Sequence, residues 1–208
     1  MRTKIALLDY GIGNLQSVAK ALNHVGADVD VVESSIDLKY YTGIVLPGVG
    51  NFGACVNALK HFGFDELVYR GVASGIPLLG VCVGLQMLFE GSSESPETKG
   101  LGLLPGKVLR FEGQERVPQM QWNTISIREG FSKSRLFTGL EDDRWMYFVH
   151  SYFAPLGDFT SSTATYGVEY SATVEVGDLY ATQFHPEKSS KEGLRLLENF
   201  VSIATVAS

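Results

Sequence analysis

Short apolar runs alternate with helical patterns along the first half of this 208-residue chain. The apolar runs lie at 4–10, 28–33, 43–50 and 76–81. Helical patterns follow the first, third and fourth of these runs, with apolar residues recurring every three or four positions. Near-continuous apolar strands that alternate with helices are typical of a parallel sheet covered on both faces. We therefore expect a three-layer α/β fold.

The second half of the chain is richer in strands. Five β-rich stretches, separated by turn residues, lie at 123–129, 144–153, 163–170, 172–178 and 179–184, and a helical pattern at 191–204 follows them. No linker, repeat or low-complexity stretch divides the chain, so we expect a single domain over 1–208. We expect its central sheet to be largely parallel, with a more antiparallel C-terminal extension.

Composition and charge limit the possible partners. Hydrophobic residues make up 45% of the chain and charged residues 19%, as in ordinary globular proteins. The net charge is −6 and no cluster of Lys and Arg occupies a predicted face, so we expect no binding to nucleic acid. The apolar segment 71–89 raises the question of a membrane span, but Pro77, Gly80 and Gly84 interrupt it. It fits a buried strand that enters a helix better, and we expect no membrane partner.

Cys82 lies in the middle of this apolar segment, in the sequence GVCVG at 80–84. A nucleophile elbow joins a buried strand to a helix through a tight turn, which needs small residues two positions before and after the nucleophile. Glycines occupy both positions. A helix N-terminus favours a thiolate, and the Val83 N–H could donate to a developing oxyanion. Free cysteines more often only pack, as we expect for Cys55, so a packing role for Cys82 stays open here.

A thiol nucleophile needs a base, and the base needs a group that orients it. His185 follows a predicted strand, and Glu187 lies two residues further on. A carboxylate there can hold the imidazole in one tautomer, while Pro186 restricts the backbone between them. A surface loop is the alternative for such a His-Pro-Glu sequence. The position at the C-terminal end of a strand favours an active site, because ligands of open α/β sheets bind at that edge.

A second glycine-rich loop, PGVGNFG at 47–53, follows another predicted strand. Glycines let backbone N–H groups approach a ligand closely, so this loop could supply an oxyanion donor near Val49 or Gly50. A phosphate-binding loop and a plain tight turn are the alternatives. The spacing matches neither of the common glycine-rich nucleotide motifs, which argues against a nucleotide site.

The two cysteines form no disulfide framework in a chain of this length, so we expect a reducing compartment, the cytoplasm.

Three motifs, PGVGNFG, GVCVGLQ and FHPEKS, together resemble the class I (triad) glutamine amidotransferases. Longer stretches, among them LLDYGIGNLQSVAKAL, GVCVGLQMLFEGSSES and QFHPEKSSKEGLRLLENF, are similar to the glutaminase subunits of imidazole glycerol phosphate synthases. The similarity spans nearly the whole chain. It implies hydrolysis of L-glutamine to glutamate and ammonia in histidine biosynthesis, with no metal and no other cofactor.

The resemblance implies a role for each matching residue. Cys82, His185 and Glu187 would form the catalytic triad, with a thioester intermediate on Cys82. The oxyanion hole would come from Val49, Gly50 and Val83, and the glutamine would be held by Gly48, Gln86, Glu94, His150, Ser151 and Tyr152. A capped histidine at a strand end is the alternative for His150.

The resemblance also implies a partner chain. Once the glutaminase parts are assigned, no residues remain for an acceptor site, so we expect the ammonia to pass to a second subunit. In the family this is a (β/α)8-barrel cyclase, which makes imidazole glycerol phosphate and AICAR and forms a heterodimer with the glutaminase. The residues that match its contact face are Asn14, Met120, Trp122, Asn123 and Lys188. We expect weak glutaminase activity from the isolated chain.

One segment departs from the family's usual sequence Pro-His-Met/Ile-Gly-Trp-Asn, because this chain has Gln119 and Gln121 at its second and fourth positions. We expect this change to alter the surface that faces the partner. It leaves open a second interpretation, in which the same glutaminase serves another acceptor synthase, such as one that aminates a nucleotide sugar for surface glycans. A third interpretation is a non-catalytic binding protein, against which the intact Cys82, His185 and Glu187 argue.

Overall fold

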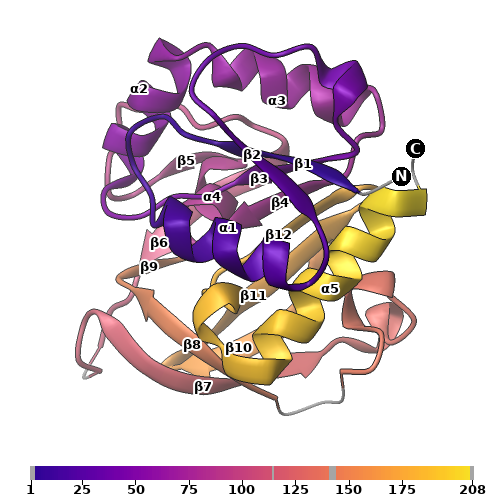
Figure 1. The fold of residues 1–208 in the computed structure, drawn as a ribbon. Coiled ribbons are helices and arrows are strands. Elements are labelled where there is room, and N and C mark those ends of the chain that lie inside the picture. The colour runs from indigo at the N-terminus through magenta and orange to yellow at the C-terminus, as the bar shows by residue number, and fades with distance from the viewer. Residues whose placement is uncertain (1–2, 114, 141–143, 207–208) are drawn as a thin grey trace.

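The main sheet has nine strands in the order β2-β1-β3-β4-β12-β11-β10-β7-β8. A computed structural model describes residues 3–113, 115–140 and 144–206 of the chain (Figure 1). The first five strands of this order run parallel to one another, which confirms the expected parallel half of the sheet. They are β1 (Lys4–Leu8), β2 (Asp28–Val32), β3 (Gly43–Leu46), β4 (Leu78–Val81) and β12 (Leu179–Thr182).

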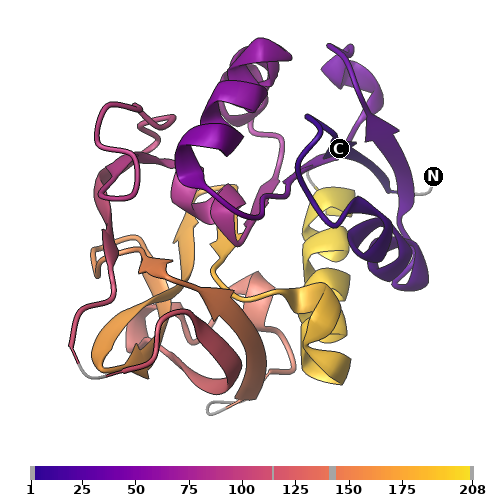
Figure 2. The same cartoon turned by 90° about the vertical axis from the view of Figure 1, so that its left-hand side faces the viewer.

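Helices cover both faces of this parallel half (Figures 1 and 2). The connection from β1 to β2 and the connection from β3 to β4 run in opposite directions along the sheet. Right-handed crossovers in opposite directions place their helices on opposite faces. One face carries α1 (Leu15–His24) and α5 (Ser190–Val206), which pack together, and the other carries α2 (Phe52–His61) and α3 (Phe64–Ala73). The expected three layers are therefore present.

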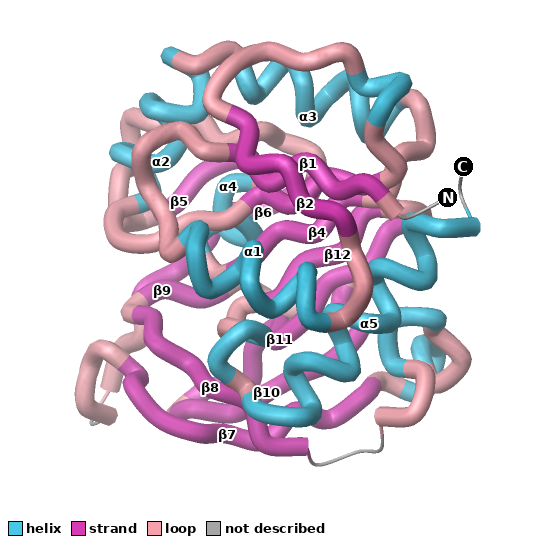
Figure 3. The backbone as a smooth tube through the Cα atoms, viewed as in Figure 1, coloured by secondary structure: helices cyan, strands magenta, loops and turns pink. Residues whose placement is uncertain are grey.

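The other four strands of the main sheet are antiparallel, as expected for the second half. They are β7 (Gln119–Ile127), β8 (Arg144–His150), β10 (Thr160–Tyr166) and β11 (Val168–Val176). A small sheet beside them contains β5 (Phe89–Ser92), β6 (Leu104–Arg110) and β9 (Tyr152–Phe153). Figure 3 shows β7, β8 and β10 at the end of the molecule away from α2 and α3. Short 3-10 helices lie at Leu38–Tyr40, Glu129–Phe131, Arg135–Phe137 and Pro186–Lys188.

Two of the predicted strands break at positions where the sequence predicted that they continue. The stretch 163–170 is a hairpin rather than one strand, because Gly167 adopts a positive φ of 69° and reverses the chain between β10 and β11. The next predicted strand, 172–178, is the continuation of β11. The stretch 144–153 likewise breaks at Ser151, where β8 ends and β9 begins.

The carboxyl ends of β3, β4 and β12 meet at one edge of the sheet. The parallel register pairs Leu46 with Gly80 and Gly80 with Ala181, so these strands finish side by side. The segments that follow them carry the loop 47–53, Cys82 and His185. The sheet therefore brings together three motifs that are far apart in sequence.

Among the described helices, none has the length and apolar character required to cross a bilayer.

Candidate active site

Cys82 occupies a strained turn between β4 and the short helix α4 (Val83–Met87). Its φ of 57° and ψ of −110° are unusual for a residue with a side chain, and such strain is common at catalytic nucleophiles. The flanking glycines make the turn possible. A Cβ on Gly84 would lie 2.0 Å from the Leu46 carbonyl oxygen, and a Cβ on Gly80 would lie 3.0 Å from the Cβ of Ala181. The expected tight turn at Cys82 is therefore present in the structure.

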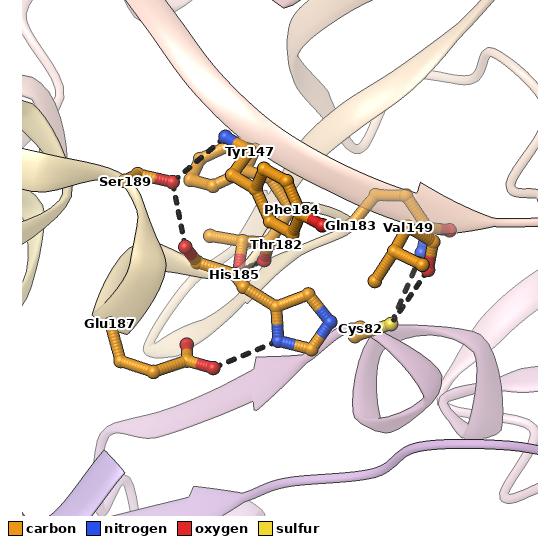
Figure 4. Close-up of polar contacts among 9 residues, drawn as sticks. All are labelled: Cys82, Tyr147, Val149, Thr182, Gln183, Phe184, His185, Glu187 and Ser189. Carbon is orange, nitrogen blue, oxygen red and sulfur yellow. Dashed lines mark hydrogen bonds and ion pairs between the residues drawn. The ribbon is translucent and has the colours of Figure 1, made fainter. Parts of the chain in front are cut away.

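His185 lies between Glu187 and Cys82, as Figure 4 shows. Its Nδ1 donates to Glu187 Oε1 over 2.9 Å, and both side chains are almost fully buried. The other ring nitrogen, Nε2, lies on the Cys82 side of the ring. Ser189 fixes the backbone here, because its hydroxyl donates to the His185 carbonyl over 2.6 Å. The three side chains thus have the arrangement that a nucleophile, a base and an orienting carboxylate would require.

The environment of His185 favours its protonated form. Burial lowers the pKa of His185, but the interactions with Cys82 and Glu187 outweigh burial and raise the pKa to about 10. A protonated imidazole beside a thiol favours the thiolate, which is the nucleophilic form of cysteine. The same imidazolium can later give its proton to a leaving group. The pair is therefore suited to attack on a carbonyl that carries a poor leaving group.

The loop 47–50 is held by hydrogen bonds to its carbonyl groups. The Gly48 carbonyl accepts from the Val83 N–H over 3.3 Å, and the Val49 carbonyl accepts from Cys55 Sγ over 3.2 Å. The Tyr10 hydroxyl donates to the Pro47 carbonyl. Val83 N–H, one of the expected oxyanion donors, is therefore occupied by a carbonyl in this conformation. The Gly48 carbonyl would have to turn away before that N–H could bind an oxyanion.

A cavity of about 280 Å³ opens in front of Cys82. Its size is near the lower end of the range for small-molecule sites. The predicted Gly48 and Glu187 do not line it, since Gly48 lies behind Val83 and Glu187 lies behind His185. The residues that line it are Val49, Gly50, Cys82, Val83, Gln86, Glu94, Pro118, Val149, His150, Ser151, Tyr152 and His185.

Glu94 brings a carboxylate to this cavity. Its Oε2 accepts a hydrogen bond of 2.6 Å from the Phe52 N–H at the start of α2. This contact with the helix N-terminus anchors the Glu94 side chain at the cavity. An anionic group at the wall of the cavity suits a ligand that carries an ammonium group. Within the described residues, no cluster of His, Cys, Asp and Glu could hold a metal ion.

His150 is buried and neutral. Burial lowers the pKa of His150 to about 4, although the hydrogen bond from Nδ1 to the Tyr152 carbonyl, at 2.8 Å, opposes this shift. Its Nε2 is also buried and has no hydrogen-bond partner among the described residues. His150 closes the back of the cavity and fixes the Tyr152 carbonyl. The alternative of a simple capped histidine at a strand end accounts for the Nδ1 bond but not for its place in the cavity wall.

The residues expected at the partner face are only partly brought together. Met120 and Trp122 lie on one face of β7 and are 63% and 43% exposed. Asn123 points to the opposite face and donates to the Thr165 carbonyl over 2.9 Å. Asn14 precedes α1, and the exposed Lys188 lies two residues after Pro186. The side chain of Asn123 therefore has a structural contact that the sequence did not reveal.

One expectation about Gln119 is wrong. Its side chain is fully buried, and the Tyr170 hydroxyl donates to its Oε1 over 2.9 Å. Gln119 therefore faces the interior of the antiparallel layer rather than a partner. Alternation along β7 places Gln121 on the same side, but near an exposed part of the strand. The departure from the family sequence thus changes the surface at Gln121 alone.

Three residues near the site were missed in the sequence. Tyr10 and Cys55 hold carbonyls of the loop 47–50, and Gln183 donates from Nε2 to Cys82 Sγ over 3.8 Å. Burial raises the pKa of the Cys55 thiol to about 11. The thiol is therefore neutral, which agrees with the packing role expected for Cys55. One feature of the sequence could have indicated Gln183, because it is a polar residue at the end of a largely apolar predicted strand. Its partners lie about a hundred residues away, so sequence alone could not identify them.

The strained cysteine turn, the buried His–Glu pair and the small cavity form a site whose geometry suits cysteine-based hydrolysis, on a sheet covered on both faces. The chain belongs to the class-I glutamine amidotransferase family, whose model matches residues 6–204. Two solved structures share the fold. PurLQS from Thermotoga maritima aligns with a TM-score of 0.77 at 17% identity, covering 98% of this chain and 99% of that one. A glutamine amidotransferase of known structure aligns with a TM-score of 0.72 at 22% identity, covering 97% and 98%.

Curated relatives give a narrower similarity. Imidazole glycerol phosphate synthase subunit HisH of Deinococcus radiodurans is 43% identical over 201 residues, which cover 95% of this chain and 92% of that protein. The HisH subunit of Methanothermobacter thermautotrophicus is 45% identical over 200 residues, covering 96% and 98%. The chain is thus a glutamine amidotransferase enzyme whose similarity to these HisH subunits extends over nearly its full length.

Proposed function

We propose that Cys82, His185 and Glu187 hydrolyse glutamine as a catalytic triad. The observation that carries this proposal is the arrangement of a strained cysteine beside a buried histidine that Glu187 orients. The Cys82 thiolate attacks the side-chain amide carbon, and the electron pair of the C=O bond moves to the oxygen. When the tetrahedral intermediate collapses, His185 gives its proton to the departing nitrogen, and ammonia leaves a thioester behind. Water then attacks the thioester with His185 as base, which releases glutamate and restores Cys82.

The cavity residues have complementary roles in this proposal. Glu94 pairs with the α-ammonium group of glutamine, and Gln86, Ser151 and Tyr152 hold the rest of the amino acid. Gly48, Val49 and Gly50 have to rearrange so that their N–H groups and the Val83 N–H bind the oxyanion. The present conformation lacks this arrangement because the Gly48 carbonyl occupies the Val83 N–H. We therefore expect the isolated chain to be a weak glutaminase.

The acceptor in this proposal is a separate (β/α)8-barrel cyclase, which uses the ammonia to make imidazole glycerol phosphate and AICAR. The names of the HisH relatives, which are subunits of imidazole glycerol phosphate synthase, support such an assembly. Exposed Met120 and Trp122, together with Asn14 and Lys188, would face the cyclase, whereas the side chain of Asn123 points to the other face of β7 and holds the Thr165 carbonyl. Contact there would reshape the loop 47–50 and complete the oxyanion hole.

The whole chain 1–208 would act as one glutamine amidotransferase domain in the cytoplasm. The family match over 6–204 supports one domain, as does the one cluster that the buried apolar residues form within the described part of the chain. Both cysteines are free thiols, which fits a reducing compartment.

A different acceptor synthase is the second candidate, and Gln121 is the observation that favours it. Since Gln119 points inward, only Gln121 changes the exposed surface relative to the family sequence. Titration of the chain with the histidine-pathway cyclase distinguishes the two candidates. Formation of a stable heterodimer supports the cyclase, whereas failure to bind supports another synthase.

Glutamate release tests the triad. We expect the chain with its cyclase and the cyclase ligand to release glutamate, and Cys82→Ala to abolish that release. Cys55→Ala serves as a matched thiol control and should keep measurable hydrolysis. Unchanged release by Cys82→Ala would show that the triad assignment is wrong, and a non-catalytic binding role would then be the better interpretation.

A further inference from the structure

The sulfur of Cys82 has two polar neighbours besides His185 (Figure 4). Cys82 Sγ lies 3.9 Å from the Val149 carbonyl oxygen, to which the thiol can donate. Gln183 Nε2 lies 3.8 Å from the same sulfur and can only donate to it. The two contacts have opposite directions. The Val149 carbonyl can only accept a hydrogen bond from the thiol, whereas the Gln183 amide can donate one to a sulfur anion.

The direction of the Gln183 amide follows from a chain of hydrogen bonds. The Tyr152 carbonyl is an acceptor only, so the amide group of Gln86 that faces it, at 3.0 Å, has to be its NH2. The second hydrogen of that NH2 group reaches Gln183 Oε1 over 3.1 Å. Gln183 Oε1 is thereby fixed toward Gln86, and the Gln183 NH2 group is left to face the sulfur.

Apart from the His185 imidazolium, other sources of stabilisation for a thiolate are weak at this site. Helix α4 has only five residues, so its dipole is small. The Val83 N–H that a thiolate or oxyanion could use is bonded to the Gly48 carbonyl. A buried anion without hydrogen-bond donors is costly. Gln183 is fully buried at the end of β12 and supplies such a donor.

We propose that Gln183 is a catalytic residue that stabilises the Cys82 thiolate and connects it to the cavity residue Gln86. It acts twice in the reaction. Before attack, its N–H raises the fraction of Cys82 present as thiolate. In thioester hydrolysis the C–S bond breaks and its electron pair returns to sulfur, so the same N–H stabilises the leaving thiolate. This inference rests on the triad proposal for its catalytic consequence, but the contact with sulfur can be tested without glutamine.

The test compares the pH dependence of Cys82 alkylation by iodoacetamide in the wild-type chain, Gln183→Met and Gln183→Glu. Gln183→Met removes the donor at nearly constant volume, and Gln183→Glu keeps an acceptor for Gln86 while placing oxygen against the sulfur. Peptides ending at Lys60 and at Lys99 separate Cys55 from Cys82 by mass. Loss of one donor to an anion predicts that the midpoint for Cys82 moves up by about one pH unit in Gln183→Met. We expect a larger shift in Gln183→Glu and an unchanged profile for Cys55.

An unchanged Cys82 midpoint in both folded variants would overturn the proposal. A second measurement uses the wild-type chain and does not depend on the variants folding. The side-chain amide protons of Gln183, followed by NMR, should titrate with the alkylation midpoint, and this titration should vanish in Cys82→Ala. A flat response in the wild-type chain would also overturn the proposal. If the midpoint shifts as expected but the complex releases no glutamate, the contact with Gln183 stands and the glutaminase proposal fails.

Discussion

His150 shows how burial decides the chemistry of one residue. It touches the Tyr152 carbonyl through Nδ1 and packs against the rings of Phe111, Phe148 and Tyr170. Because these neighbours offer no negative charge, the imidazole stays neutral, whereas His185 is held protonated by Cys82 and Glu187. Two histidines in one site therefore carry different charges at neutral pH. The sequence predicted that both belong to the site, but their opposite protonation states depend on tertiary contacts.

The neutral state of His150 makes the protein sensitive to acid. Its pKa is about 4 in the folded chain against an ordinary value of 6.5, so the unfolded chain binds the proton more tightly. Neutral His150 therefore contributes about 3 kcal/mol to the free energy of unfolding above pH 6.5, and this contribution is lost as the pH falls toward 4. His185 does not interfere in this window, since its raised pKa changes stability only above pH 6.5. Urea unfolding between pH 7 and pH 4 should show a smaller loss for His150→Gln than for the wild-type chain.

His24→Gln is the control for this prediction, because His24 is exposed at the end of α1. It should lose stability in acid as the wild-type chain does. Equal acid dependence for the wild-type chain and His150→Gln would show that His150 is not held neutral by burial.

At the scale of elements, the closeness of α4 to β3 determines where the nucleophile sits. Gly84 lets the first turn of α4 approach the end of β3 so closely that no side chain fits between them. The glycine spacing predicted this turn because a strand-to-helix elbow tolerates few residues at these positions. The short length of α4 could not be predicted, since apolar Leu88 and Phe89 could continue a helix, but residues 89–92 pair with β6 instead.

Gly84→Ala should therefore destabilise the chain strongly. The new methyl group would lie 2.0 Å from the Leu46 carbonyl oxygen, and backbone on both sides would have to move. We expect a loss of about 3 kcal/mol or more in the free energy of unfolding. Gly130→Ala is the matched control, because its Cβ would meet no atom within 4 Å, and we expect a change within about 0.5 kcal/mol. Similar urea midpoints for the two variants would contradict the close approach of α4 and β3.

At the scale of the whole molecule, Trp122 and Trp145 are exposed on β7 and β8, the last two strands of the sheet order. Register pairs Trp122 with Tyr147 and Thr124 with Trp145, so both tryptophans lie on one face of the β7–β8 hairpin. Val149 on β8 approaches the sulfur of Cys82, and the Tyr147 carbonyl accepts from the backbone N–H of His185. The same hairpin thus carries an exposed apolar face and contacts to the triad. Sequence similarity predicted Met120 and Trp122 on this face, but the connection through β8 is a property of the assembled sheet.

Trp122→Ala should weaken binding to the cyclase. Trp122 is 43% exposed, so truncation should leave the fold intact while removing a large aromatic contact from the proposed interface. We expect the Kd measured by calorimetry to rise about tenfold or more. Val176→Ala is the control, because Val176 is 51% exposed and lies beside the start of β12, at the edge of the sheet opposite Cys82. Equal affinities for the two variants would place the interface elsewhere.

The bond between the Gly48 carbonyl and the Val83 N–H has a thermodynamic consequence for the proposed assembly. Suppose that the cyclase binds best to the conformation in which this bond is broken. A ligand of the glutamine site that needs the Val83 N–H then also binds best to that conformation. Linkage makes the effect reciprocal, so each ligand strengthens the binding of the other by the same factor. A glutamine-derived electrophile attached to Cys82, whose oxyanion requires the Val83 N–H, would therefore hold the cyclase more tightly than the unmodified chain does. Occupancy of the glutamine site could then be measured as the affinity of the heterodimer.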